Sequence, residues 1–222
     1  SLRVLNNGKF TTQLCFTAHG NETARAAMVD ALVEKLKNTL IVYEDYDADQ
    51  LYGLTLSDHD ATIHCTCEHC QASLEKYGSL SGIQIEVINE INKKILVWMN
   101  ENPRYDKNIL LMPFAYVEND QKAPVEWDAE SKKWVGKEGL TAFSGTTNTG
   151  KTVQTSVFLV TSYAKVQTLP EKEFDGTDHL YSDVKNQGEN YENNEQNLLI
   201  QQWKDFIGDA KMYLWYNSQE YN

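Results

Sequence analysis

Residues 54–70 read LTLSDHDATIHCTCEHC, a strand-like run that passes into acidic residues and then into clustered cysteines. In α/β enzymes the catalytic side chains follow the carboxyl ends of parallel strands, and Asp58 and Asp60 stand at such a position. The cysteines that follow indicate a metal site, a disulfide or a specially shaped loop. This stretch therefore predicts both a fold class and a candidate site.

On both sides of this stretch, short apolar runs alternate with helical patterns. The runs expected to form strands are residues 13–18, 51–56, 109–116, 155–163 and 212–216. One helix is expected to be capped by Asn21, and a second to open with a Ser81/Gln84 capping box and to end before Pro103. A last helix is expected to begin at Asn194. This alternation predicts a parallel sheet covered by helices.

The predicted fold class is α/β, a (β/α)8-type barrel or the C-terminal five-eighths of one, in a single domain covering residues 1–222. Val125–Trp127 and Lys133–Val135 flank a turn-rich segment and predict a β-hairpin arm. Residues 169–193 are acidic, rich in Asn and aperiodic, so a long surface loop is expected there. A partial barrel has exposed edge strands, so we expect the native protein to be longer or its sheet edge to be covered.

Residues 145–152 read GTTNTGKT and match the P-loop pattern Gly-x-x-x-x-Gly-Lys-Ser/Thr. A P-loop holds phosphates only when a helix follows it, because the amides of the helix N-terminus form part of the site. The residues that follow are VQTSVFLVTSY, which are rich in β-branched side chains and predict a strand. We therefore interpret this segment as a surface loop and not as a nucleotide site.

The charge of the chain limits its partners. The formal net charge is −12 and the pI is about 4.8, so binding to nucleic-acid phosphates or to an anionic membrane surface is not expected. No run of about 18 apolar residues is present that could span a membrane. The chain shows no signal peptide and begins at Ser1 without a methionine, which indicates a processed form or a piece of a longer protein.

The cysteines form the pattern C-x-C-x-x-C at Cys65, Cys67 and Cys70, with histidines interleaved. Thiolates at this density can hold zinc, although no second C-x-x-C pair is present. Cys15 would supply a fourth thiolate if its strand lay beside residues 51–56. A disulfide among these four cysteines is the rival interpretation, and either arrangement would shape the loop more than it would carry chemistry.

Carboxylates follow two consecutive predicted strands. Asp60 follows the strand at 51–56, and Glu118 follows Tyr116 at the end of the next one. Glycoside hydrolysis needs such a pair, one group to protonate the leaving oxygen and one to act as base or nucleophile. Aromatic side chains at the same strand ends suit stacking on sugar rings. The alternative is that 32 acidic residues place some carboxylates at strand ends without a function.

Several ordered motifs resemble those of a known family. They are Gln13-Leu14-Cys15, Leu56–Asp60 with Cys65–Cys70, Val87–Ile91, Phe114-Ala115-Tyr116, and Asn194, Trp203 and Leu214-Trp215. On these residues the chain resembles a large bacterial family of uncharacterised proteins with a glycoside-hydrolase-like barrel. That family is catalogued as a domain of unknown function and is distantly similar to α-glucuronidases and β-hexosaminidases. The chain departs from it at Trp215-Tyr216-Asn217, where the family often has Trp-Asp-Tyr, so one acid is absent.

The resemblance implies a carbohydrate-active or carbohydrate-binding protein of a polysaccharide-using bacterium. We expect this protein to hydrolyse a glycosidic bond and to be secreted, periplasmic or exposed at the cell surface. The resemblance assigns no catalytic pair; from their places after two consecutive strands, Asp60 and Glu118 are expected to be that pair, and no cofactor is expected to be required beyond a structural zinc. The side chains expected to bind substrate are Asp58, His59, Tyr116, Trp215 and Asn217. A non-catalytic glycan-binding module is the alternative function, and a metal- or disulfide-stabilised structural domain is the third.

Overall fold

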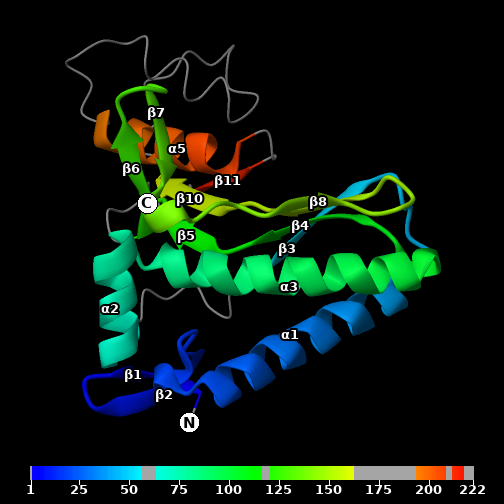
Figure 1. The fold of residues 1–222 in the computed structure, drawn as a ribbon, viewed down its shortest axis with the longest axis horizontal. Coiled ribbons are helices and arrows are strands. Elements are labelled where there is room, and N and C mark those ends of the chain that lie inside the picture. Colours follow the sequence, from blue (N-terminus) through cyan, green and yellow to red (C-terminus); the bar gives the residue numbers. More distant parts are fainter. Residues whose placement is uncertain (1, 57–63, 117–120, 163–193, 209–211, 218–222) are drawn as a thin grey trace.

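The computed structural model describes residues 2–56, 64–116, 121–162, 194–208 and 212–217, and Figure 1 shows their arrangement. The α-helices are α1 (Glu22–Val42), α2 (Glu68–Tyr77), α3 (Ser81–Glu101) and α5 (Asn194–Ile207). The strands near the N-terminus and in the first sheet are β1 (Arg3–Asn6), β2 (Lys9–Leu14), β3 (Leu51–Thr55), β4 (Asn108–Met112) and β5 (Phe114–Tyr116). The later strands are β6 (Val125–Asp128), β7 (Lys133–Gly136), β8 (Ser144–Thr146), β9 (Thr152–Thr155), β10 (Phe158–Ser162) and β11 (Tyr213–Asn217).

The parallel strands follow one another across the sheet in chain order. β3 pairs with β4 and β4 with β9, while β5 pairs with β10 and β10 with β11, and all these pairs are parallel. Hydrogen bonds from Ser156 N to Leu111 O (3.1 Å) and from Phe158 N to Pro113 O (3.0 Å) join the two sets of strands. The order is therefore β3, β4–β5, β9–β10, β11, and the carboxyl ends of these strands share one edge.

Pro113 separates β4 from β5. Proline has no N–H to donate to a neighbouring strand, so it interrupts the hydrogen-bond ladder without ending the direction of the chain. The strand predicted at 109–116 is therefore found as two strands, β4 and β5. The predicted strand at 155–163 is likewise found as two strands, β9 and β10, which begin three residues earlier than expected.

Helices α1 and α3 run together along one side of the strands (Figure 1). Their apolar stripes pack against alternate residues of β4 and β9, which share one face because side chains alternate along a strand. The fully buried members of this core are Val87, Ile91, Ile95 and Met99 of α3 with Ile109 of β4 and Val153 of β9. The apolar periodicity that predicted these helices is thus the periodicity of the core.

Asn89 joins α3 to the segment that leads into β8 and to the end of β9. Its side-chain oxygen accepts from Phe143 N (2.9 Å) and from the Thr155 hydroxyl (2.7 Å), and its amide nitrogen donates to Thr141 O (2.7 Å). The neighbouring amide of Asn92 donates to the same Thr155 hydroxyl at 3.0 Å. Asn89 satisfies two backbone groups, Thr141 O and Phe143 N, and both amides tie α3 to the sheet.

The hairpin arm is confirmed. β6 and β7 pair antiparallel with Trp127 opposite Trp134, and the two indoles meet edge to face with ring centroids 5.4 Å apart.

The segment with the P-loop pattern is also as expected, because Ser144–Thr146 and Thr152–Thr155 form an antiparallel pair and a strand follows the turn in place of a helix.

Two local predictions differ from the structure. Ser81 lies inside α3 and does not cap it; the residue before the helix is Leu80, and the Ser81 hydroxyl donates to Gln121 O at 3.2 Å. The strand expected at 13–18 ends at Leu14 and pairs with β1 in a separate hairpin. The chain then turns away, because Cys15 N donates to Leu2 O (2.7 Å) and Cys15 is drawn into a buried cluster.

The predicted N-cap of α1 is confirmed, since the Asn21 side chain accepts from Ala24 N at 2.9 Å. Replacing Asn21 with Ala leaves that N–H without its acceptor, so we expect the free energy of unfolding to fall by about 1 kcal/mol. Urea unfolding followed by circular dichroism measures this change. Asn21→Asp keeps an acceptor and is the control; equal losses for Ala and Asp would contradict the capping role.

The predicted loop at 169–193 lies outside the described residues. Within the described helices, none is both long enough and apolar enough to cross a membrane.

Candidate functional site

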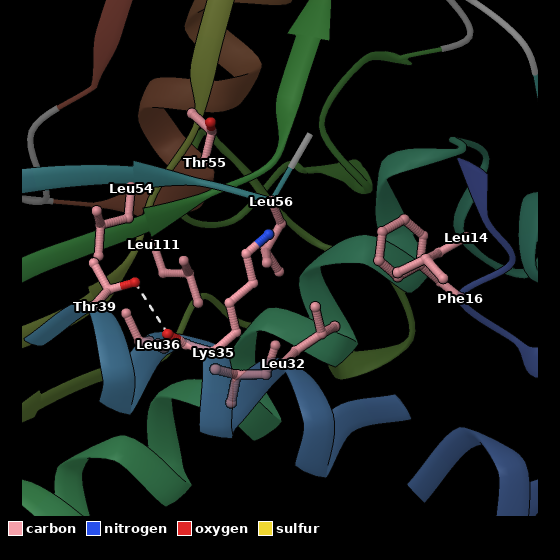
Figure 2. Close-up of a pocket in the computed structure, with 11 residues that line it drawn as sticks. Leu14, Phe16, Leu32, Lys35, Leu36, Thr39, Leu54, Thr55, Leu56 and Leu111 are labelled. Carbon is pink, nitrogen blue, oxygen red and sulfur yellow. Dashed lines mark hydrogen bonds between the residues drawn. The ribbon is translucent and has the colours of Figure 1, made fainter. Parts of the chain in front are cut away.

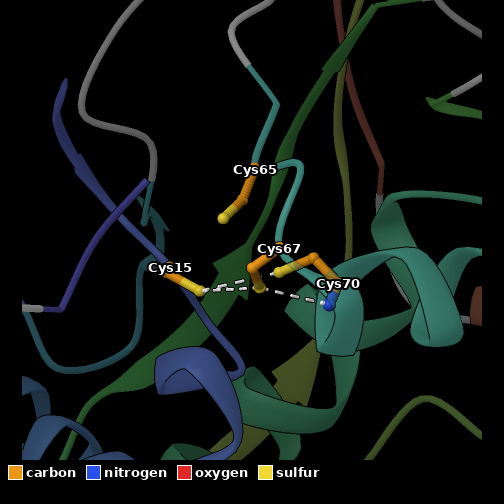
Figure 3. Close-up of side chains that lie close together, drawn as sticks. All are labelled: Cys15, Cys65, Cys67 and Cys70. Carbon is orange, nitrogen blue, oxygen red and sulfur yellow. Dashed lines mark hydrogen bonds between the residues drawn. The ribbon is translucent and has the colours of Figure 1, made fainter. Parts of the chain in front are cut away.

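Four cysteines from separate parts of the chain meet beside the N-terminal hairpin. Cys15 directly follows β2, Cys65 and Cys67 precede α2, and Cys70 lies in the first turn of α2. Figure 3 shows their side chains converging on a common centre. The fourth ligand that the sequence left conditional, Cys15, is therefore brought to the C-x-C-x-x-C motif, although its strand does not pair with β3.

The sulfur atoms have the spacing of a tetrahedral metal site. All four lie within 4.8 Å of one another, and Cys15 Sγ is 3.9 Å from Cys67 Sγ and 3.6 Å from Cys70 Sγ. Zn–S bonds of about 2.3 Å in a tetrahedron imply sulfur separations of about 3.8 Å. The four residues are buried, and all four are free thiols. Their donor chemistry and spacing thus fit one zinc ion.

The hairpin is tied to the cysteine segment by its backbone. Leu5 N donates to Cys65 Sγ at 3.3 Å, and both the N–H and the hydroxyl of Thr66 donate to Leu5 O, at 2.7 and 2.9 Å. The Asn6 side chain donates to His64 O at 3.0 Å. Amide donors to a ligand sulfur orient it and stabilise its thiolate, so these contacts suit the metal site as well as the fold.

Helix α2 contributes its positive end to the cluster. Cys67 is the N-cap of α2, and its sulfur accepts from Cys70 N at 3.4 Å. Unpaired amides at a helix N-terminus favour negative charge, and they lower the free energy of a nearby thiolate. The spacing C-x-x-C across the start of the helix therefore gives the Cys67 sulfur a backbone donor and brings Cys70 beside it.

Thr17 is a member of the site that the sequence analysis missed. Its buried hydroxyl lies 3.2 Å from both Cys15 Sγ and Cys70 Sγ and 3.6 Å from Cys67 Sγ. A hydroxyl at these distances can donate to a thiolate and fix its direction. The only signal in the sequence is its position two residues after Cys15, which has meaning only once the turn at Ala18–Gly20 is known.

Charge is unevenly shared among the sulfurs. A hydrogen bond from the Cys70 thiol lowers the pKa of Cys15 to about 4, although burial opposes this shift. The same contact, together with burial, raises the pKa of Cys70, and burial raises the pKa of Cys65. Negative charge concentrates on Cys15 because a second thiolate in this buried space would repel the first. A bound dication would remove that repulsion and permit all four to ionise.

The interleaved histidines do not complete the cluster. His69 turns its ring to Glu68, with Nε2 3.3 Å from a carboxylate oxygen, and it is largely exposed. The metal-capable group found in the described part of the chain consists of the four cysteines. Four sulfur ligands close a tetrahedral site and leave no open position for a substrate.

The predicted carboxylates belong to residues 57–63 and 117–120. Asp58, His59, Asp60 and Glu118 lie outside the described residues. Described residues on each side of residues 57–63 have defined contacts. Leu56 N donates to Met112 O at 3.0 Å, and Cys65 belongs to the sulfur cluster.

The other candidate substrate-binding residues occupy neighbouring strand ends. Tyr116 ends β5 and is paired with Val160 of β10, and Trp215 of β11 is paired with the same Val160 from the other side. Asn217 ends β11 opposite Ser162. The backbone therefore brings Tyr116 and Trp215 into one row across the sheet and places Asn217 further along the same edge.

Comparisons with known proteins bear on the family of the chain. No curated protein and no solved structure matches it. The sequence profile described as Domain of unknown function (DUF4838) matches residues 3–135, which is more than half of the chain and includes all four cysteines. The chain belongs to this family, the domain of unknown function DUF4838.

Proposed function

We propose that the four cysteines bind one structural Zn²⁺ that fixes the segment following β3. The observation that carries this proposal is the mutual approach of four buried sulfurs to within 4.8 Å. Cys15, Cys65, Cys67 and Cys70 would be the ligands, and the Thr17 hydroxyl and the Leu5 amide would support them from outside. Zinc supplies a fixed tetrahedral link between these chain segments when bound.

Such a link has a clear mechanical consequence. The hairpin β1–β2 has only two strands, and an isolated two-stranded hairpin is marginally stable in water. Cross-linking it to the start of α2 stabilises the hairpin and α2 together. It also holds one end of residues 57–63, whose other end continues from β3.

Metal analysis of the purified chain tests this proposal. We expect about one zinc per chain, release of that zinc by a strong chelator, and the absorption of tetrahedral cobalt thiolate after replacement by Co²⁺. Thiol counting and intact mass distinguish the rival arrangement. A metal-free chain with its cysteines oxidised to disulfides would contradict the zinc proposal and support the disulfide interpretation.

We further propose that the parallel strands are an arc of a (β/α)8-type barrel that acts on carbohydrate. The observation that favours this is the chain-order, parallel arrangement of β3, β4–β5, β9–β10 and β11, because a barrel is built from such neighbours. Active sites of barrels lie at the carboxyl ends of the strands. The predicted acids follow two adjacent strands at that edge.

The proposed reaction is hydrolysis of a glycosidic bond. Asp60 would donate a proton to the leaving oxygen, and Glu118 would act as the base for water or as the nucleophile. Asp58, His59, Tyr116, Trp215 and Asn217 would bind and orient the sugar. Carboxyl groups about 5.5 Å apart would predict retention of configuration, and separations of about 6.5–9.5 Å inversion. Such a role suits a secreted, periplasmic or cell-surface protein.

Asp60→Asn and Glu118→Gln test this reaction. Each removes a proton-transfer group while keeping its size, so we expect hydrolysis on a glycan panel to fall at least about a hundredfold. Glu130→Gln is the control, because Glu130 is an exposed carboxylate in the turn of the hairpin arm. Full activity in Asp60→Asn would exclude the proposed acid.

A non-catalytic glycan-binding module is the alternative on the same scaffold. Trp127 supports it, since this indole is 52% exposed on the hairpin arm and is braced by Trp134. Exposed aromatic faces stack on sugar rings. Glycan binding without hydrolysis, and its loss in Trp127→Ala, would favour this alternative over catalysis.

A further inference from the structure

A hollow lies at the amino ends of β3 and β4. It has a volume of about 260 Å³ and lies between the C-terminal end of α1 and the starts of β3 and β4. Its walls include Tyr43, Tyr46 and Tyr52, with Leu54 and Ile109 as apolar neighbours. A cavity of about 150 Å³ accepts a benzene ring, so this one has room for a single-ring molecule with one substituent.

Aromatic rings form the outer part of the hollow. Tyr43 and Tyr46 are stacked with ring centroids 4.6 Å apart, and Tyr46 lies 6.4 Å from Tyr52. Tyr46 is 54% exposed, so solvent reaches this side. The Tyr52 hydroxyl donates to Asp47 O at 2.7 Å, which holds its ring in place. Rings arranged in this way offer faces and edges to a flat, apolar ligand.

Lys107 gives the hollow a charge. It is only 2% exposed, and its Nζ donates to Glu44 O at 3.1 Å, between Tyr43 and Tyr46 in the chain. The nearby carboxylates have other partners. Glu44 forms an ion pair with Arg104, and Asp106, the residue before Lys107, accepts a hydrogen bond from the Thr147 hydroxyl. No carboxylate of the described residues pairs with Lys107.

A buried ammonium without an opposite charge is costly, because burial removes its hydration. Its three N–H groups exceed the one acceptor found for it. We propose that this hollow binds a small ring-bearing carboxylate, with the ligand anion on Lys107 and its ring against the tyrosines. The site lies at the amino ends of the strands, so it is independent of the zinc and the glycan chemistry proposed above.

Titration calorimetry with benzoate tests this assignment. Benzoate should bind in the millimolar range, and benzamide, which has the same shape without the charge, should bind at least about tenfold more weakly. Lys107→Met keeps the length of the side chain and should weaken benzoate by about tenfold. Tyr46→Leu alters an exposed ring and should weaken it by about fivefold while Lys107 is intact.

Lys35→Met is the control, the same substitution at an exposed lysine outside the hollow. Lys35 lines the neighbouring apolar hollow between α1 and β3, which Figure 2 shows, and it is not part of the tyrosine-lined one. It should leave benzoate binding unchanged. Equal binding of benzoate and benzamide, or no binding of benzoate up to about 10 mM, would overturn the proposal. Lys107 would then serve only to hold the segment after α1 through Glu44 O.

Discussion

Replacing Cys70 with Ser is expected to abolish zinc binding and to remove the stabilisation that the metal provides. Three thiolates remain, and a neutral hydroxyl is a poor zinc ligand. A ligand that binds only the folded state stabilises it by about 4 kcal/mol when its free concentration is a thousand times its Kd. We therefore expect a loss of about this size at saturating zinc.

The change in the free energy of unfolding on adding a chelator separates the contribution of zinc from the other effects of the substitution. A buried Ser in place of Cys70 destabilises the fold by itself, so the useful comparison is unfolding with and without chelator in each variant. Wild-type protein should lose stability on chelation, and Cys70→Ser should not change further. His69→Ala, next to Cys70 but outside the sulfur cluster, should keep its zinc. Zinc retained in Cys70→Ser would contradict the four-sulfur site.

Trp203→Ala is expected to lower the free energy of unfolding by about 3–5 kcal/mol, because it leaves a cavity in the buried cluster between α5 and strands β5 and β10. Trp203 is fully buried and meets Phe206 edge to face at 6.1 Å. Its other neighbours in this core include Ala115 of β5 and Leu159 of β10. The side chain therefore fastens α5 to the sheet, and its removal leaves a cavity that the strands cannot close.

Urea unfolding measured by circular dichroism and by the fluorescence of the remaining tryptophans checks this expectation. Leu198→Ala on the same helix is the matched control, because Leu198 is 44% exposed and should change stability by no more than about 0.5 kcal/mol. If Trp203→Ala were as mild as Leu198→Ala, α5 would not be packed on β5 and β10 as described.

Features that depend on neighbours in the chain were predictable. The Asn21 cap, the hairpin of residues 125–136 and the interruption at Pro113 each follow from side-chain chemistry within a few residues. The strand after Lys151 also followed from its β-branched residues, in spite of the P-loop pattern. In each case the side chain and the backbone N–H or C=O that it affects are only a few residues apart, so the sequence alone shows the interaction.

Features that depend on distant residues were not predictable in the same way. Ser81 has the pattern of a cap, yet its hydroxyl is used by Gln121 O, forty residues away. Asn89 in a helical stripe reads as a polar interruption, although it satisfies three groups around β9. Lys107 has the character of a surface lysine in the sequence, yet it is buried and its ammonium binds Glu44 O, more than sixty residues away.

By itself, the sequence determined helices α1, α3 and α5 and the parallel strands, because apolar periodicity and local capping act over a few residues, but it did not predict β1, β8 or α2. It also determined that Cys65, Cys67 and Cys70 would meet, since they are close in the chain. Only the tertiary structure decided that Cys15 and Thr17 join them, about fifty residues apart in sequence. That approach depends on the β1–β2 hairpin docking beside α2 through long-range hydrogen bonds, and no local pattern encodes such a contact.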